Sequence, residues 1–567
     1  MSEAKQPAKG RQSKTAVVVI HGIGEQRPLG TIKEFVETVY RRDRSLATRA
    51  LGEIGLLDVP IVPDSSTGSA ELRRLTTLAD GPPKRTDFFE LYWADIMDGT
   101  PVDMVTGWIQ TLLLRSPWRL PNAKKVQRAW WILVGIVAVI AAAGYITIYP
   151  DWIEAWALSQ WIGRWVNRLL PFAGALSVAA AVALVLWRWG RAKRKMSEVK
   201  LLEPAILLVV GLVLLLLPAP IAGSLRFWAG AATAGFTWAL TAIITPYAGD
   251  VVRYVRATPS TVERRRQVRE RGMALLEVLH KKRLDGETIC EDFTQAETSN
   301  PPLYDRIVIV GHSLGTIIAY DLVQLFWEKH GPTHHQAWKV GAPGVQEALA
   351  EADAHVKAAW GKERLGFSPD AFRMTQDKLY TVLHDAPPRW RISDLITLGS
   401  PLTHAEFLLA DSENEVQQAF VERRFATCPP RPDPMRDGSM LFPARGQEED
   451  VLFPHFAAQF AAVRWTNIYD EDENPLLGDL ISGSLTGSYG PGIAQHAVSI
   501  ERPNKQGWRR RVFTHTRYWT WHESYEPSEA SVAAAAKLRS LDKKRALLWE
   551  NVPEHIKQLR LALNLGT

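Results

Sequence analysis

The sequence predicts an α/β fold, a mostly parallel sheet with helices on both faces, that is interrupted by a four-helix transmembrane insertion. Short β-branched runs alternate with longer helical patterns near both ends of the chain, which is typical of a mostly parallel sheet. Between these regions lie four long stretches without a charged residue. A chain of 567 residues has room for both parts.

The expected sheet strands are short apolar runs at separate places in the chain. The first, residues 15–20 (TAVVVI), ends in His21-Gly22-Ile23-Gly24, and another, residues 306–310 (RIVIV), leads into Gly311-His312-Ser313-Leu314-Gly315. Further strands are expected at 88–93, 394–398, 464–469 and 510–514. Residues 405–462 are polar and weakly periodic, which predicts an insertion over the sheet.

The four uncharged stretches are long enough to cross a bilayer as helices, which takes about 20 apolar residues. They comprise residues 129–150, 169–187, 204–225 and 227–249. Tryptophans lie at their ends, where the indole ring prefers the headgroup layer. Buried helices of a large protein are the alternative explanation for any single stretch, but not for four in succession.

Charge predicts the orientation of these spans. Arginine and lysine gather before the first span (115–128), between the second and third (188–200) and after the fourth (253–271). Because basic residues favour the cytoplasmic side of short loops, we expect two hairpins with both soluble parts in the cytosol. The two other connections carry little charge.

These patterns divide the chain into five expected parts. They are a disordered N-terminus (1–14), a first part of the sheet domain (15–120), the transmembrane region (121–250), the remainder of the sheet domain (251–526) and a C-terminal helical segment (527–567). The N-terminus is polar and basic, and it lacks the apolar core of a signal peptide.

Composition excludes several classes of protein. The formal net charge of +6 is too small for a dedicated nucleic-acid binder, and much of it lies beside the apolar stretches, which favours anionic lipid headgroups as partners. Cys290 and Cys428 fit neither a zinc site nor a CxxC motif, so we expect no disulfide framework and a reducing compartment.

The strongest chemical signal is the run IVIV-GHSLG-TIIAYDLV, a strand, a Gly-x-Ser-x-Gly turn and a helix. A sharp turn of this kind lifts a serine oxygen above the sheet, and the glycines at 311 and 315 prevent backbone clashes. An incidental match to the five-residue pattern is the alternative, but the flanking strand and helix favour Ser313 as a nucleophile.

At this point the chain resembles the α/β-hydrolase family of serine lipases and esterases. The resemblance rests on GHSLG, on VVVIHGIG, and on three further segments. Those segments are LITLGSPL (395–402), WTNIYDEDENPLLG (465–478) and THTRYW (514–519). They cover well under a quarter of the chain, but they follow the family's order of oxyanion loop, nucleophile, acid and histidine.

The resemblance implies roles for several residues. Backbone N–H groups of Ile23 and Leu314 are the expected oxyanion hole, and a simple glycine-rich turn is the alternative for the first. His515, on a loop after the last strand, is the expected base, with His496 and His522 as further candidates. His330, His334 and His335 lack a convincing fourth ligand, so we expect a solvated loop and no metal site.

The acid is less clear, because the acidic run departs from the family's pattern. Asp470, Asp472, Glu473 and Asp479 all lie after the strand expected at 464–469. Asp472 is preferred because it lies in the loop beyond the strand, where a carboxylate can orient the imidazole. The other three remain candidates, and the acidic run could also be only a solvated turn.

The resulting expectation is a membrane-anchored serine hydrolase that cleaves carboxylic esters without a cofactor. A site held at a bilayer would meet lipid esters at high local concentration, so membrane lipids are the expected substrates and residues 405–462 a candidate lid. Acyl transfer, thioester cleavage or a catalytically inactive membrane scaffold are the alternatives. The sequence does not predict an oligomeric state.

Overall fold

The computed structural model describes the residues that form the sheet and its surroundings. The described ranges are 13–23, 27–46, 59–63, 73–77, 85–97, 261–284, 301–332, 344–361, 366–386, 389–405, 409–443 and 451–565, the last two with short gaps, and scattered positions between 127 and 259. The chain divides into two compact units, of which unit 1 is Met1–Arg128 with Tyr247–Thr567 and unit 2 is Ala129–Pro246.

Eight of the described strands form one mostly parallel sheet in unit 1. Its order is β10-β9-β6-β5-β1-β4-β3-β2, and only the pairings of β3 with β4 and of β2 with β3 are antiparallel. The strands are β1 (Lys14–Ile20), β2 (Ile61–Pro63), β3 (Arg73–Thr76), β4 (Thr86–Leu91), β5 (Tyr304–His312), β6 (Ile392–Leu398), β9 (Arg464–Asp470) and β10 (Ala494–Val498). A separate hairpin pairs β7 (Leu441–Pro443) with β8 (Leu452–Pro454).

Helices connect and cover these strands. The longer ones are α1 (Gly30–Val36), α12 (Val262–Lys281), α13 (Leu314–His330), α14 (Val345–Trp360), α15 (Pro369–Asp385), α17 (Glu413–Val421), α19 (Glu529–Ala536), α20 (Leu541–Leu548) and α21 (Glu554–Leu563). Single turns and short helices are η1 (Glu37–Arg41), α3 (Ala94–Met97), η5 (Pro401–His404), η6 (Gln459–Ala461), α18 (Thr486–Tyr489), η7 (Gly507–Arg511) and η8 (Glu523–Tyr525).

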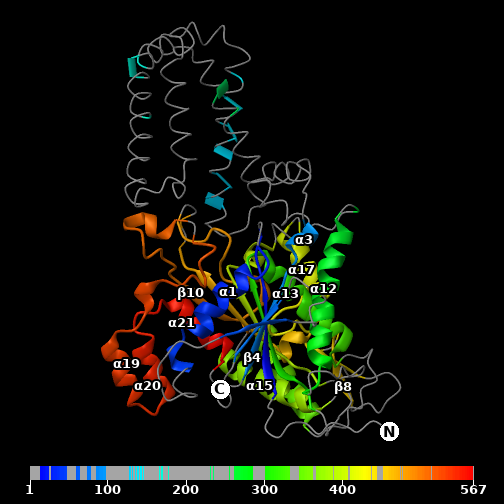
Figure 1. The fold of residues 1–567 in the computed structure, drawn as a ribbon. Helices are drawn as coiled ribbons and strands as arrows, with labels where there is room; N and C mark the ends of the chain where they lie inside the picture. Colours follow the sequence, from blue (N-terminus) through cyan, green and yellow to red (C-terminus); the bar gives the residue numbers. More distant parts are fainter. Residues whose placement is uncertain are drawn as a thin grey trace. The chain divides into compact units, whose positions relative to one another are not determined.

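Both faces of the sheet are buried, because successive side chains of a strand point to opposite faces. In β1, Val18 packs into one hydrophobic cluster with residues of α12, α13, α14 and α15. Its neighbours Val17 and Val19 pack into a second cluster with residues of α1 and α21. Figure 1 shows the strands running between these helices. The α/β fold with helices on both faces is therefore confirmed.

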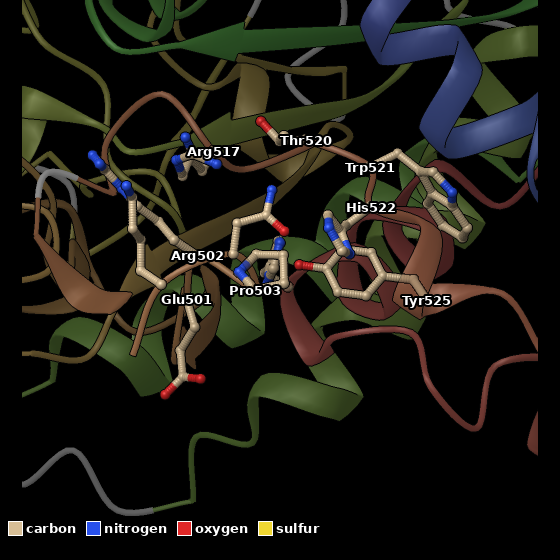
Figure 2. A pocket seen from close by; sticks show the side chains of 11 residues that line it. Glu501, Arg502, Pro503, Arg517, Thr520, Trp521, His522 and Tyr525 are labelled. Carbon is tan, nitrogen blue, oxygen red and sulfur yellow. The ribbon is translucent and has the colours of Figure 1, made fainter. Parts of the chain in front are cut away.

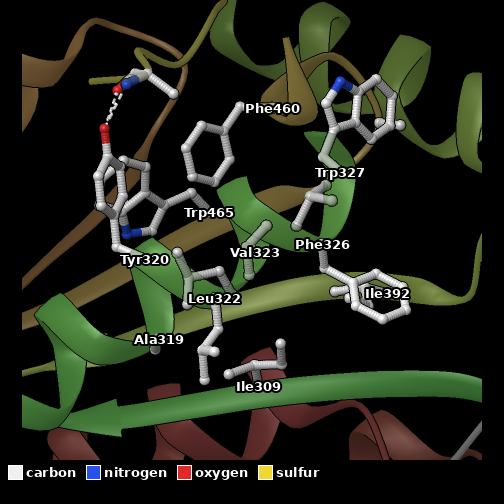
Figure 3. Packing of buried hydrophobic residues seen from close by; sticks show 14 of the residues in the cluster. Ile309, Ala319, Tyr320, Leu322, Val323, Phe326, Trp327, Ile392, Phe460 and Trp465 are labelled. Atoms are coloured by element: carbon white, nitrogen blue, oxygen red, sulfur yellow. Dashed lines mark hydrogen bonds between the residues drawn. The ribbon is translucent and has the colours of Figure 1, made fainter. Parts of the chain in front are cut away.

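Helix α13 is the most deeply buried helix of the first cluster. Phe326 and Trp327 on α13 have no exposed surface, and Trp327 packs edge-on against Trp390 at a ring separation of 4.9 Å. Closer to the middle of the helix, Tyr320 donates a hydrogen bond to the Ala426 carbonyl (Figure 3). These contacts hold the helix firmly, so the turn at its first residue is fixed relative to the sheet.

The strand order places a topological switch point between β1 and β5. The chain leaves the carboxyl end of β1 toward β4 on one side, whereas it leaves β5 toward β6 on the other side. In open α/β sheets such a divergence opens a crevice at the carboxyl ends of the two strands, and ligands bind there. We call this position at the carboxyl ends of β1 and β5, where His21-Gly22 and Ser313 follow their strands, the sheet crevice.

Most predicted strands are present, and one is wrong. The described residues of 510–514 do not pair with the sheet, and Arg510 and Arg511 belong instead to the η7 turn. The last strand is instead β10, an edge strand with mostly half-buried residues that the sequence analysis missed. Lys14, expected in the N-terminal tail, already belongs to β1.

The segment expected to be a lid is largely integral to the hydrophobic core. Described residues of 405–462, including Phe420, Cys428 and Phe460, are fully or almost fully buried in the same cluster as α13. A cover that swings open would expose this surface to water. We therefore do not assign a lid to the described part of this segment.

The four predicted spans lie almost entirely outside the described residues. Among the helices that the structure does describe, none combines the length and the apolar character that crossing a bilayer requires. The longest of them, α12, carries many arginines. The transmembrane insertion and its orientation therefore stay predictions.

Candidate functional site

The predicted oxyanion loop and the predicted nucleophile adjoin each other at the sheet crevice. Residues of β1 and β5 pair in parallel up to Ile20 and Gly311, so His21-Gly22 and His312-Ser313 leave the sheet side by side. A Cβ atom added at Gly22 would lie 2.8 Å from the Ser313 Cβ. The tight approach explains why glycine occupies this position.

Ser313 has the backbone of a strained strand-to-helix turn. Its φ of 54° and ψ of −128° are sparsely populated for a residue with a side chain. A Cβ at Gly311 would lie 2.5 Å from the Gly315 carbonyl oxygen, and a Cβ at Gly315 would overlap the carbonyl oxygens of Ile20 and His21. Both glycines are thus required by close backbone contacts, as the sequence predicts.

His515 is held by a carboxylate at the crevice. Its Nδ1 lies 2.9 Å from Asp479 Oδ2, and Asp479 has no exposed surface. His515 follows β10 along the chain, whereas Asp479 lies between β9 and β10. The pair is therefore assembled from loops that follow two neighbouring parallel strands.

Further donors surround the Asp479 carboxylate. The Tyr518 hydroxyl donates to Oδ2 over 2.8 Å, and the Ile481 backbone N–H donates to Oδ1 over 2.9 Å. Burial raises the pKa of Asp479, but the charge of His515 and these hydrogen bonds outweigh it and hold the pKa well below its usual range. Asp479 is therefore ionised and can stabilise a protonated imidazole.

Gly399, which directly follows β6, lies against this pair. Its φ is +60°, and an added Cβ would lie 3.0 Å from Asp479 Oδ2 and 3.2 Å from His515 Nδ1. The backbone N–H of Ser313 donates to the carbonyl of Leu398, the residue before Gly399. The carboxyl end of β6 thus contacts both the serine and the His515–Asp479 pair.

His312 connects the serine turn to the loop of His515. Its Nε2 lies 2.8 Å from the His515 carbonyl oxygen, and the two rings are 4.9 Å apart. Burial, followed by the charge of His515, lowers the pKa of His312 to about 3, so the ring is neutral. A neutral Nε2–H donating to the carbonyl makes His312 a positioning residue rather than a base.

A similar arrangement holds the turn after β1. The ring of His21 stacks on Trp93 at 4.9 Å, and the Trp93 indole N–H donates to the His21 carbonyl. Burial lowers the pKa of His21 to about 4. These contacts fix the backbone that leads to Ile23, the predicted oxyanion donor.

The second predicted oxyanion donor is Leu314, the first residue of α13. The N–H groups in the first turn of a helix have no carbonyl partner within the helix, so that of Leu314 is available to an anion. Ile23 lies beside Gly22 and is half-buried. Both donors are therefore carried by the two turns that meet at the crevice.

His515 Nε2 is buried and makes no hydrogen bond to any described residue, so a direct bond to Ser313 is not formed. Ser313 itself is only 3% exposed. Catalytic hydrogen bonds are often long before substrate binds.

The preference for Asp472 as the partner of His515 is corrected by this geometry. Asp472 Oδ2 lies 3.4 Å from Arg511 Nε, and its Oδ1 accepts the Asn474 backbone N–H. Asp470 accepts a hydrogen bond from Thr514 over 2.7 Å, and Glu473 lies outside the described residues. Asp479, the last of the four candidates, is the carboxylate that reaches the imidazole.

The other histidines have different surroundings. His496 lies on the edge strand β10, and His522 caps the η8 turn by accepting the Ser524 backbone N–H. His330 pairs with Glu277 at 3.1 Å, whereas His334 and His335 lie outside the described residues. Within the described ranges, no group of metal-ligating side chains gathers.

Sequence reasoning missed two residues of this site. Tyr518 was noted only as part of the closing motif, and its hydrogen bond to Asp479 needs the folded loop. Gly399 lies in the quoted LITLGSPL segment, where a glycine directly after a buried strand was the available signal.

Comparisons with known proteins found no relative, so the function is proposed from the geometry around Ser313, Asp479 and His515. No protein-family model, curated protein or solved structure matches the chain.

Proposed function

We propose that the protein is a serine ester hydrolase of the α/β-hydrolase type. The observation that carries this proposal is the His515–Asp479 pair beside Ser313, whose strained backbone lies at the turn between β5 and α13. Ser313 directly follows β5, whereas Asp479 and His515 lie on longer loops that follow β9 and β10. A nucleophile, a base and an acid that orients the base are the parts that acyl transfer requires.

The proposed reaction uses each residue at a stated atom. His515 Nε2 takes the proton of the Ser313 hydroxyl as Oγ attacks the ester carbonyl carbon, and Asp479 stabilises the imidazolium through Nδ1–H. The backbone N–H groups of Leu314 and Ile23 stabilise the oxyanion. The imidazolium returns the proton to the departing alcohol, and water then cleaves the acyl-enzyme in the same way.

The order of the elements supports the finer assignment to the α/β-hydrolase fold. The nucleophile follows β5 in the middle of the sheet, the acid follows β9 and the histidine follows β10, which is the order Ser, Asp, His of that family. The oxyanion loop follows β1, the neighbour of β5.

Lipid esters are the proposed substrates, because the four uncharged stretches of the sequence would hold the site at a bilayer. The basic flanks of those stretches favour a cytosolic position for the sheet domain. This part of the proposal rests on the sequence alone.

Hydrolysis of a series of p-nitrophenyl esters by the full chain in detergent tests the proposal. We expect turnover with a preference for longer acyl chains, and a loss on the order of 10⁶-fold in kcat in Ser313→Ala. An intact mass after a brief incubation should show the acyl group on the wild-type chain only. Folded wild type without turnover would favour the inactive scaffold, and acylation without release to water would favour an acyltransferase.

A further inference from the structure

A cavity is lined by the 501–505 loop, the 517–525 segment and the first turn of α21. Its volume is about 290 Å³ (Figure 2). Its lining is unusually basic, with the side chains of Arg502, Lys505 and Arg517 contributing three permanent cations. Among the described residues that line it, Glu501 is the one carboxylate, and it is bound to Arg510 at 2.8 Å.

The guanidinium of Arg517 has no hydrogen-bond acceptor in the described part of the chain. Among the residues that the structure describes, no carboxylate, carbonyl or hydroxyl accepts a hydrogen bond from it, and its Nε is buried. Removing a guanidinium nitrogen from water without an acceptor costs on the order of 1–3 kcal/mol. A cation in this position is therefore suited to an anionic ligand.

Arg502 is a second cation that lines the same cavity as Arg517. Burial and then the positive charge of Arg517 lower the pKa of Arg502. Figure 2 shows Arg502 and Arg517 toward one end of the cavity, with His522 and Tyr525 toward the other. Two guanidinium groups that repel each other would both be stabilised by one anion between them.

The remaining lining suits a phosphate that carries an organic group. Asn504 offers an amide, and Tyr525 offers a hydroxyl. Trp521 and Tyr525 pack edge to face at 5.6 Å, which adds an aromatic wall. Bidentate contacts from arginine match the oxygens of a phosphate, and three cations suit a dianion better than a monoanion.

We propose that this cavity binds a phosphate monoester, with Arg517 and Arg502 on the phosphate oxygens and the aromatic wall beside the organic group. The proposal does not rest on the ester hydrolase activity, because none of its residues belongs to the Ser313 crevice. The phosphate could be carried by a small soluble molecule or by a lipid headgroup, and the experiment separates these two sources.

The test is calorimetric titration of the full chain in detergent, using Ser313→Ala so that hydrolysis cannot contribute. The titrants are inorganic phosphate, dibutanoyl phosphatidic acid as a phosphate monoester on a lipid backbone, and dibutanoyl phosphatidylcholine as a phosphodiester. We expect inorganic phosphate and phosphatidic acid, which can both carry two negative charges, to bind. Phosphatidylcholine, a phosphodiester, should bind at least tenfold more weakly. Glycerol 3-phosphate, a soluble monoester without acyl chains, is the comparison for the source: tighter binding of phosphatidic acid would identify a lipid headgroup, and equal or weaker binding would identify a small soluble molecule.

Matched variants show whether the cavity is responsible. Arg517→Gln and Arg502→Gln should each weaken binding at least tenfold, whereas Arg509→Gln should leave it unchanged, since Arg509 lies in the same region, exposed and outside the cavity lining. Unchanged thermal midpoints would show that the variants fold. Absence of phosphate binding to the folded chain, or equal weakening by Arg509→Gln and Arg517→Gln, would overturn the proposal.

Discussion

At the scale of single residues, the choice among four nearby acidic residues depends on which carboxylate is buried. Asp479 is fully buried, and it accepts hydrogen bonds from Tyr518 and Ile481 in addition to its contact with His515. Asp472 instead lies near Arg511. The two residues are therefore a matched pair for substitution.

We expect Asp479→Asn to lower kcat for ester hydrolysis on the order of 10⁴-fold, because an amide cannot stabilise the imidazolium and favours the wrong tautomer. Asp472→Asn should change kcat less than about threefold. The measurement is steady-state kinetics on both variants at equal folded concentration. The reverse ranking would restore Asp472 as the acid.

A buried glutamate near the β1 turn predicts a pH dependence of stability. Glu90 on β4 is 1% exposed, and burial raises its pKa to about 7 even though it accepts the Leu29 backbone N–H. The unfolded chain releases this proton near pH 4.5, so the folded state binds more protons between that pH and about 7. The contribution of Glu90 to stability is therefore fully present below pH 4.5 and falls as pH rises to about 7.

Glu90→Gln should remove this slope, because glutamine still accepts the Leu29 N–H but does not ionise. Between pH 4.5 and about 7, the free energy of unfolding of the wild type should fall by about 3 kcal/mol more than that of the variant. Denaturant unfolding of unit 1 at several pH values measures it. A wild-type slope that persists in the variant would assign the pH dependence to other groups.

At the scale of elements, the site depends on where strands end. Gly399 follows β6 with a φ of +60° and touches both Asp479 and His515. A side chain there would adopt a left-handed backbone at a cost of roughly 1–2 kcal/mol and would also displace the carboxylate or the ring.

Gly399→Ala should therefore lower both the thermal midpoint and kcat, the latter by at least tenfold. Gly344→Ala is the control, since Gly344 also has a positive φ, +82°, but no atom lies within 4 Å of its added Cβ. We expect this control to lose stability only. Equal kcat in the two variants would show that Gly399 does not support the His515–Asp479 pair.

The elements that could be predicted from sequence were the buried ones. Continuous apolar runs such as residues 15–20 and 306–310 are strands because both faces of the central sheet are covered. The edge strand β10 reads AQHAV and is only half-buried, so its pattern is weak. The run RRRVF at 509–513 resembles a strand in its sequence, but its three arginines belong to η7 and are exposed or half-exposed.

The site residues also differ in how far local sequence alone predicts them. Ser313 and the glycines of the turn are recognisable because local geometry demands those residue types at a strand-to-helix turn. His515 is recognisable only through the THTRYW motif, because no described strand directly precedes it. The acid was ambiguous, since Gly478, directly before Asp479, has a φ of +66° and approaches Asp472 so closely that an added Cβ would lie 2.7 Å from the Asp472 Cβ. Which carboxylate then meets the imidazole depends on tertiary contacts that spacing does not encode.

At the scale of the whole molecule, the sheet domain is assembled from two distant parts of the chain. β1 and β4 precede unit 2, whereas β5 follows it, yet β5 pairs with β1 along its length. If the uncharged stretches cross a bilayer, they must do so an even number of times for these strands to meet on one side.

The orientation of the membrane region remains a prediction with a direct test. We expect protease to leave residues 302–567 intact in right-side-out vesicles and to cleave them in inverted ones. If residues 302–567 stay intact in inverted vesicles and are cleaved in right-side-out ones, the sheet domain lies on the opposite side of the membrane.

The most direct test of the central claim is covalent labelling of Ser313 by a fluorophosphonate. The account predicts that the wild-type chain gains the mass of one adduct on the peptide that contains Ser313, more slowly in Asp479→Asn and not at all in Ser313→Ala. Labelling that persists in Ser313→Ala, or a folded wild-type chain that never reacts, would contradict it.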